Sequence, residues 1–293
     1  AFANIADALA DSEPVHINVC DADHEKDVRK ILSRQRARAQ HVTFHHIPTN
    51  EPWCRDHGPI FITRSEDPRV AVLDWDYNAW GWKYPPFDED DVVPTRIAEE
   101  FGLPVFLPGM VLEGGSIDVN GTGALLTTES CLLNQNRNPD LSKEDIEKNL
   151  RDYLGIKEII WLGDGIEGDD TDGHIDDLTR FVAHDVIVTV VEEDEGGPNF
   201  EPLQHNLELL RSMTAEDGEP LELHTLPMPR KIMRDGQRLP ASYANFYIAN
   251  RVVLLPTFAD VNHRWAAAVL QKLFPKRKIV PIGCRELIWG LGA

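Results

Sequence analysis

The sequence has 293 residues, of which 42% are hydrophobic and 27% charged, and its formal net charge is −20. No apolar run approaches the roughly 20 residues of a membrane-spanning helix, and so acidic a chain is a poor partner for nucleic acid but suits a cationic ligand. The four cysteines are far apart and form no Cys-x-x-Cys pair, which indicates free thiols in a reducing, cytoplasmic compartment.

Amphipathic helices recur along the chain. In chain order the apolar spacing predicts them at residues 24–35, 92–102, 142–155, 200–213 and 263–274. The third is the best marked, because Ser142 and Asp145 resemble a capping box at its start and Gly155 is a typical residue just beyond a helix end. A short apolar strand follows each helix, and a pair of strands precedes most of them.

The resulting unit of strand, strand, helix and strand recurs about five times, which is typical of propellers and other repeat arrays. No linker rich in Pro, Ser or Gly interrupts the series, so we predict one α/β domain over residues 1–293, with helices outside short, mixed sheets. An ordinary α/β sandwich with accidental regularity is the alternative. In a radial array, polar residues from distant segments meet in one central pocket.

The first polar motif is EPWCRDHGPIFIT at residues 51–63, where Trp53, Arg55 and Asp56 precede an apolar strand. Such a set can form the rim of a pocket for a planar cation, or it can be a surface turn with Trp53 plugging the core. Arg55 could lower the pKa of the Cys54 thiol. In strand geometry, however, Cys54 faces away from its neighbours, which favours a buried bystander over a nucleophile.

The second motif is VLEGGSIDVNG at residues 111–121, in which Glu113 precedes Gly114 and Gly115. Paired glycines let the backbone turn sharply or approach a ligand closely. The alternative is a hairpin bend with Glu113 in solvent. The chain has no phosphate-binding glycine motif at a junction of strand and helix.

The third motif, GDDTDGHIDD at residues 168–177, gathers five aspartates around one histidine. If a strand begins at His174, that residue and Asp176 share one face, and an imidazole beside a carboxylate is a typical general acid and base. An EF-hand is excluded, because its first and last ligand positions fall on Gly168 and Thr179. The alternative is a solvated acidic turn.

The fourth motif is LPASYANFYIAN at residues 239–250, where Tyr243, Asn245 and Tyr247 alternate with apolar residues. This pattern predicts a half-buried strand with one polar face. That face can serve structure alone or can form part of a pocket wall.

Together, WCRD, EGG, TDGHID and LPASYANFYIAN resemble the guanidine-modifying enzymes of the pentein fold, and among them the agmatine deiminases and the Porphyromonas-type peptidyl-arginine deiminases. The similarity extends along nearly the whole chain, including ESCLLNQNRNP at residues 129–139 and the final RELIWGLGA. It implies a five-fold pseudo-symmetric α/β-propeller of ββαβ units, which we expect to be truncated at both ends in this chain.

The resemblance implies hydrolysis of agmatine to N-carbamoylputrescine and ammonia in putrescine and polyamine biosynthesis. By this resemblance Asp56 and Asp176 are carboxylates that grip the guanidinium, since a planar, forked cation is held best by bidentate acceptors. His174 moves protons, and Glu113 orients it. Trp53 lines the substrate slot. The other candidates for substrate binding are Asn245 in the pocket wall and Asp170 and Asp172 near the cationic far end of the substrate.

The family's nucleophile is a cysteine that follows a glycine-rich turn, and we expect it just beyond Ala293. Its thiolate attacks the guanidinium carbon and expels ammonia, which leaves a covalent intermediate for water to open. Residues 1–293 alone are therefore expected to bind agmatine weakly without turnover. Cys54 or Cys284 could take the place of that cysteine only in a rearranged pocket. No cofactor or metal is implied; the expected partners are the small cationic substrate and further copies of the chain in a homo-oligomer.

Three alternatives remain open. A deiminase of free or peptidyl arginine needs a cation at the pocket rim for the substrate carboxylate, and Arg55 and Arg137 are the nearest candidates. A non-catalytic pentein-fold binding protein would lack the acids that hold guanidinium. A metal hydrolase would use one histidine and three carboxylates, namely His174 with Asp56, Glu113 and Asp176, which is a poor zinc set.

Overall fold

The computed structural model describes residues 1–34, 41–214, 218 and 220–292. Gln35, at the end of the first predicted helix, and Ala293, the reference point for the expected nucleophile, lie outside this part of the chain. In the part that it describes, no helix combines the length and the apolarity needed to cross a membrane.

Four three-stranded sheets share one topology in the described part of the chain, in which the first two strands are antiparallel and the last two are parallel. The four sheets comprise β3 (Ile60–Thr63), β4 (Val70–Leu73) and β5 (Val105–Phe106); β6 (Asp118–Val119), β7 (Ala124–Thr128) and β8 (Glu158–Leu162); β9 (Thr179–Phe181), β10 (Val186–Val191) and β11 (Glu222–Pro227); β14 (Tyr247–Ile248), β15 (Val252–Thr257) and β16 (Lys278–Gly283). The parallel pairing follows from the helical crossover between the second and third strands.

A fifth sheet contains the parallel pair β1 (Val15–Val19) and β2 (Val42–His46) joined through α2 (Ala22–Arg34). The repeating unit of two strands, a helix and a strand that the sequence predicts is therefore present in each three-stranded sheet, and the last three of its elements are present around α2. A separate hairpin pairs β12 (Met233–Arg234) with β13 (Gln237–Arg238).

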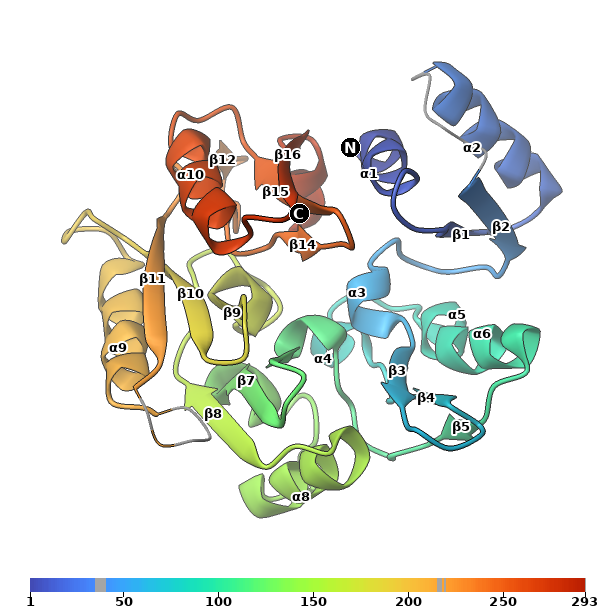
Figure 1. The fold of residues 1–293 in the computed structure, drawn as a ribbon, viewed down its shortest axis with the longest axis horizontal. Helices are drawn as coiled ribbons and strands as arrows, with labels where there is room; N and C mark the ends of the chain where they lie inside the picture. Colours follow the sequence, from blue (N-terminus) through green and yellow to red (C-terminus); the bar gives the residue numbers. More distant parts are fainter. Residues whose placement is uncertain (35–40, 215–217, 219, 293) are drawn as a thin grey trace.

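The crossover helices lie at the rim of the molecule, whereas the short helix α3 lies nearer its centre (Figure 1). The rim helices are α2, α6 (Val93–Phe101), α8 (Lys143–Leu154), α9 (Phe200–Arg211) and α10 (His263–Leu273). They match the five predicted helices to within a few residues. Within the residues that the structure describes, the other helices are α1 (Phe2–Leu9), α3 (Cys54–His57), α4 (Ala79–Trp82), α5 (Asp88–Asp91), α7 (Glu129–Leu132) and the 3₁₀ turns η2 (Gly114–Ser116), η3 (Ile175–Asp177) and η4 (Leu287–Gly290).

The middle strand of each three-stranded sheet is buried on both faces, because helices cover one side and neighbouring units the other. All five residues of β7 are buried, for example, as are the central residues of β10 and β15. These strands are accordingly mostly apolar along both faces rather than alternating, with threonines as their buried polar residues, which is typical of strands covered on both sides.

Three local predictions need correction. No strand begins at His174, because that residue caps η3 and β9 starts only at Thr179. Cys54 is the first residue of α3 rather than part of a strand, and it is exposed. Of the segment 239–250, only β14 is a strand. A helical turn replaces the expected strand at Cys54 and after His174, and irregular backbone replaces it over residues 239–246. The alternation of polar and apolar residues could not reveal either change.

Candidate active site

A small cavity of about 70 Å³ collects residues from distant parts of the chain. Its lining comes from α3, from the acidic loop and η3, from the loop before β14, and from η4 and the residues that follow it. The lining residues are Trp53, Arg55, Asp56, Thr171, His174, Asp176, Asp177, Asn245, Gly290, Leu291 and Gly292. Five of the eight predicted site residues are therefore brought together here: Trp53, Asp56, His174, Asp176 and Asn245.

Asp56 is held by two neutral donors. Its Oδ2 accepts a hydrogen bond from the indole Nε1 of Trp80 at 3.1 Å, and its Oδ1 accepts one from the backbone N–H of Gly115 at 3.0 Å. Burial, followed by the charges of Asp176 and Glu113, raises the pKa of Asp56 to about 8. This carboxyl thus lacks a strong cationic partner within the chain. A cationic ligand beside it would favour its ionised form and lower its pKa.

Gly115 allows this close approach. A Cβ at that position would lie 2.5 Å from His174 Nδ1 and 2.7 Å from Asp56 Oδ1, so no side chain fits without displacing both groups. Gly115 therefore lets the backbone approach His174 and Asp56, and Gly114 lets it approach the carbonyl of Arg55. The approach of these glycines to a ligand stays a prediction.

His174 sits at the end of the acidic loop. Its backbone N–H donates to the carboxylate of Asp169 at 3.1 Å, and Gly173, at φ 99°, makes the turn that aims the ring inward. Nδ1 lies 3.7 Å from Asp56 Oδ1 and 4.0 Å from Asp176 Oδ1. Burial, with help from the positive charges of Arg137 and Arg55, holds the pKa of His174 well below its ordinary value, so the ring is neutral when the cavity holds no further charge.

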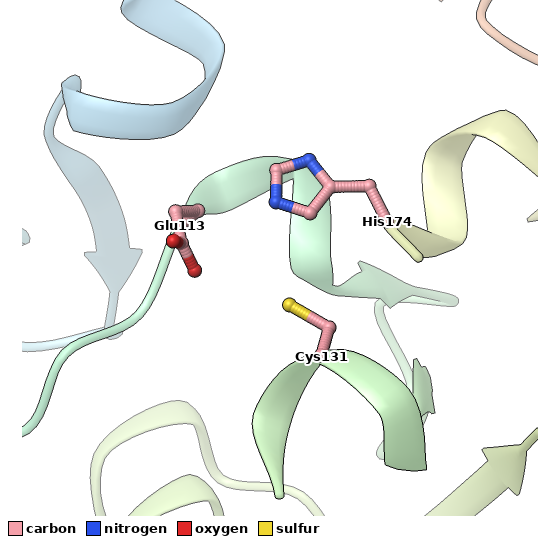
Figure 2. Close-up of side chains that lie close together, drawn as sticks. All are labelled: Glu113, Cys131 and His174. Carbon is pink, nitrogen blue, oxygen red and sulfur yellow. The ribbon is translucent and has the colours of Figure 1, made fainter. Parts of the chain in front are cut away.

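Glu113 lies outside the cavity lining and behind His174. It is fully buried, and its Oε1 accepts a hydrogen bond from Arg137 Nε at 2.6 Å. Its carboxylate, the ring of His174 and the thiol of Cys131 have donor atoms within 4.8 Å of one another (Figure 2). The predicted orienting carboxylate is thus close to the histidine, although no hydrogen bond joins the two.

Asp176 and Asp177 are adjacent carboxyls that both line the cavity. Burial raises the pKa of Asp176, while Arg55, whose Nε is 3.6 Å from Oδ2, and then Arg180 oppose that rise. Burial and the charge of Asp176 raise the pKa of Asp177 well above its ordinary value. Sequence reasoning missed Asp177, because consecutive residues of a strand point to opposite faces, whereas the 3₁₀ turn η3 turns both side chains toward the cavity.

Asp170 and Asp172 lie apart from the cavity lining, on the outer part of the acidic loop. The carboxylate of Asp172 accepts from Lys83 Nζ at 2.7 Å and from Arg137 at 2.6 Å, and Asp170 accepts from the hydroxyl of Tyr84. Asp172 therefore already holds two cations of the chain itself, whereas Asp170 pairs with a neutral hydroxyl. Their predicted contact with the far end of a substrate stays a prediction.

None of the cysteines in the described residues lines the cavity. Cys284 is buried elsewhere, and Cys131 lies behind His174. Cys54 is exposed at the surface, but protein crowds its thiol from the other side, so desolvation and then the charge of Asp56 raise its pKa, with Arg55 opposing. Arg55 does lower the pKa of Cys54, as the sequence suggested, but desolvation and the charge of Asp56 raise it by more.

Comparisons with known proteins, by sequence and by structure, all match deiminases along nearly the whole chain. The model of the Porphyromonas-type peptidyl-arginine deiminases matches residues 1–293. A curated protein of Shewanella sp. (strain MR-7), assigned to the agmatine deiminases, is 36% identical over 99% of this chain and 82% of its own length.

Two solved structures are similar over the full chain. Agmatine deiminase of Enterococcus faecalis is 35% identical with a TM-score of 0.93, covering 100% of this chain and 84% of its own. A Cys-to-Ser variant of C. jejuni agmatine deiminase with substrate bound is 33% identical with a TM-score of 0.90, covering 100% and 83%. With the family model matched over its whole length, this chain belongs to the Porphyromonas-type peptidyl-arginine deiminase family, within the pentein superfamily.

Proposed function

We propose that this protein is an agmatine deiminase, which hydrolyses the guanidinium group of agmatine to N-carbamoylputrescine and ammonia. The observation that carries the proposal is the meeting of Asp56 and Asp176 in one cavity, with Nδ1 of His174 3.7 and 4.0 Å from their carboxylates. Both named solved relatives are agmatine deiminases, and one of them has substrate bound. The formal net charge of −20 also favours a cationic substrate over an anionic one.

The roles follow from the chemistry of a guanidinium ion. Asp56 and Asp176 each accept N–H bonds from opposite edges of the planar cation. Its charge drives the proton of Asp56 onto the ring of His174, whose Nδ1 lies 3.7 Å away, so that the ring becomes an imidazolium. A cysteine thiolate adds to the guanidinium carbon. The C–N bond then breaks, and the departing nitrogen takes a proton from His174 as ammonia. His174 next removes a proton from water, which displaces the thiolate and leaves a neutral ureido product.

Glu113 is the proposed positioning residue behind the ring, where its negative charge favours the imidazolium that forms during proton transfer. The nucleophile is the cysteine predicted just beyond Ala293. Two observations support it: Gly290, Leu291 and Gly292 line the cavity, and the C. jejuni enzyme with substrate bound is a Cys-to-Ser variant. Gly290 and Gly292 also pack on the Trp53 indole, where a Cβ would approach to 2.7 and 2.9 Å. Trp53 is thus placed to wall the substrate slot, and Asn245 to complete it.

Deimination of free or peptidyl arginine is the second candidate. Arg137 is buried in ion pairs with Glu113 and Asp172 and is not free to bind a substrate carboxylate. Arg55 lines the cavity with 46% of its side chain exposed and is the specific observation in favour of an arginine substrate. A non-catalytic binding protein is disfavoured by the buried, costly acids Asp56, Asp176 and Asp177, for which folding alone gives no reason.

At the level of the whole chain, we propose a single domain that is a five-unit α/β-propeller. The succession of the five small sheets around the view of Figure 1 supports it. Further copies of the chain in a homo-oligomer stay a prediction, which light scattering of the purified protein tests.

Ammonia release tests the function in a protein that includes the predicted cysteine, because residues 1–293 alone are expected to bind agmatine without turnover. Agmatine should be hydrolysed, whereas a peptide with a C-terminal arginine should not. Asp176→Asn should lower kcat/KM for agmatine by roughly two orders of magnitude, because a charge-assisted contact worth about 3 kcal/mol is lost. Asp140→Asn, at an exposed position, is the matched control and should leave activity unchanged. Faster release from the peptide than from agmatine would transfer the assignment to the arginine deiminases, and equal loss in both variants would remove Asp176 from the site.

A further inference from the structure

Three different metal-binding side chains converge on the side of His174 that faces away from the cavity. Donor atoms of Glu113, Cys131 and His174 lie within 4.8 Å of one another, and the residues are 0%, 0% and 3% exposed. Figure 2 shows the thiol of Cys131 rising from α7 toward the gap between the carboxylate and the ring. In the part of the chain that the structure describes, no other three such side chains have their donor atoms this close together.

Two of the three donors have no hydrogen-bond partner in the described structure. They are Oε2 of Glu113 and Nε2 of His174, both fully enclosed. A buried polar atom without a partner costs about 1–3 kcal/mol, so it calls for an explanation. Both orphaned atoms belong to the same small group as the thiol, and an occupant that accepts lone pairs from all three would satisfy them together.

The chain holds the three side chains in place without help from any occupant. Arg137 fixes the other carboxylate oxygen of Glu113 at 2.6 Å. The hydroxyl of Thr128 accepts from the backbone N–H of Cys131 at 3.3 Å and donates to the carbonyl of Gly173 at 2.6 Å, which ties α7 to the loop carrying His174. Supporting contacts of this kind are typical of ligand sets with fixed geometry.

We propose that Glu113, Cys131 and His174 form a binding site for one thiophilic divalent cation such as Zn²⁺ or Cd²⁺. Sulfur, imidazole nitrogen and carboxylate oxygen are the ordinary zinc donors, and their bond lengths imply donor separations of roughly 3.3–3.8 Å. Because the donor atoms lie within 4.8 Å of one another, the side chains need to close in by at most roughly 1.5 Å. This set differs from the one histidine and three carboxylates of the metal-hydrolase alternative, because a thiol replaces two of the acids.

The charges of the proposed site balance. On binding, the thiol of Cys131 releases its proton to solvent, and thiolate and carboxylate together neutralise the two positive charges of the ion. Arg137 keeps Asp172 as its counter-ion at 2.6 Å. No oxidation or reduction takes part, and the three ligands leave one coordination position for water.

The effect of the bound cation on agmatine hydrolysis rests on the proposed function, whereas the existence of the cation site does not. A cation on Nε2 leaves Nδ1 of His174 facing the carboxylates of the cavity, so agmatine should still bind. The ring could no longer gain a proton at Nε2, and Glu113 could no longer stabilise the imidazolium. The cation is therefore expected to be an inhibitor that lowers kcat more than it changes KM.

Titration of the purified protein with Cd²⁺ tests the site without any substrate. The ultraviolet absorption of a cadmium–thiolate bond should rise to a plateau at one ion per chain. Cys131→Ser should abolish it, while Cys54→Ala and Cys284→Ala should retain it. Glu113→Gln, which preserves side-chain shape, and His174→Asn, which removes Nε2, should each raise Kd by roughly tenfold or more.

The proposal is overturned if the signal survives in Cys131→Ser, disappears in Cys54→Ala, or never reaches one ion per chain. If circular dichroism shows that Cys131→Ser does not fold, Glu113→Gln and His174→Asn test the site instead. A Kd for Cd²⁺ that is unchanged in both of these variants would exclude the site. A protein that includes the predicted cysteine and binds Cd²⁺ as expected, but releases no ammonia, would retain this site and lose the proposed function.

Discussion

At Gly115 the backbone comes close to two of the proposed catalytic groups, His174 and Asp56. Gly115→Ala should push His174 and Asp56 apart, since its Cβ would lie 2.5 and 2.7 Å from their polar atoms. Misplacement by about 1 Å costs roughly 100-fold in rate, so kcat/KM for agmatine should fall by about that factor. Gly283→Ala is the control, because its Cβ meets no atom within 4 Å. Similar kinetics in the two variants would contradict the proposed role of the close approach.

Asp56 makes a testable contribution to the pH dependence of stability. Its pKa rises from 3.8 in the unfolded chain to about 8 in the folded protein, so the folded state holds a proton that the unfolded state has released. The stability it contributes is therefore complete below about pH 4 and is lost as the pH rises through about 8.

Asp56→Asn removes that dependence. The free energy of unfolding of the variant, relative to the unsubstituted protein, should increase steadily between about pH 5 and about pH 8. Urea unfolding at several pH values measures this difference, with Asp140→Asn as the exposed control. Parallel curves for Asp56→Asn and the unsubstituted protein would mean that this carboxyl is ionised throughout the range.

At the scale of single elements, local sequence signals predict a helix best where the residues that begin and end it lie next to it in the sequence. Helix α8 begins with the predicted capping box, in which Ser142 and Asp145 exchange hydrogen bonds at 3.2 and 3.0 Å, and ends at Gly155 with φ 68°. By contrast, the turn η3 has no such signal. The chain bends there because Asp169, Thr171 and Gly173 hold His174, and because Ser242, from a distant loop, donates to the carbonyl of Asp177 at 2.6 Å.

Removal of the cap of α8 should have a measurable but modest effect. Ser142→Ala leaves the N–H of Asp145 without its side-chain acceptor and should lower the free energy of unfolding by about 1 kcal/mol. Ser212→Ala, which removes only a hydroxyl that donates to Leu209 at the end of α9, is the comparison and should cost less. Chemical denaturation measures both. A loss below about 0.3 kcal/mol in Ser142→Ala would show that tertiary packing alone holds this helix end.

At the scale of the whole molecule, buried charges join neighbouring units. Arg180, on β9, donates from Nε to Asp118 of β6 at 2.8 Å and from a terminal nitrogen to the carbonyl of Phe246 at 2.8 Å. Arg180 therefore links the sheets of β9 and β6 and the residue that precedes β14, and it is 5% exposed. Nothing in the linear order of residues pairs Arg180 with Asp118, because 62 positions separate them.

Asp118→Asn should destabilise the protein strongly. The change leaves the charge of Arg180 buried with only neutral acceptors, and breaking one partner of a buried pair costs about 3–5 kcal/mol. Asp185→Asn is the control, since Asp185 pairs with His184 at the surface and 51% of its side chain is exposed. The melting temperature and the urea midpoint of the two variants provide the comparison. Equal stability would show that Arg180 does not depend on Asp118.

The sequence by itself determined three features: the five rim helices, the recurring unit (two strands, a helix and a strand), and the residue types that suit a guanidinium ion. It could do so because periodicity, caps and side-chain chemistry are local properties. Only the tertiary structure decided which of those residues meet. It brought Asp56 and Asp176 to one cavity, added Asp177 through a 3₁₀ turn, bound Asp172 to Lys83 and Arg137, and set Cys131 behind His174. The physical reason is that such meetings depend on how separate units pack, and on contacts between residues far apart in the chain, which no local pattern records.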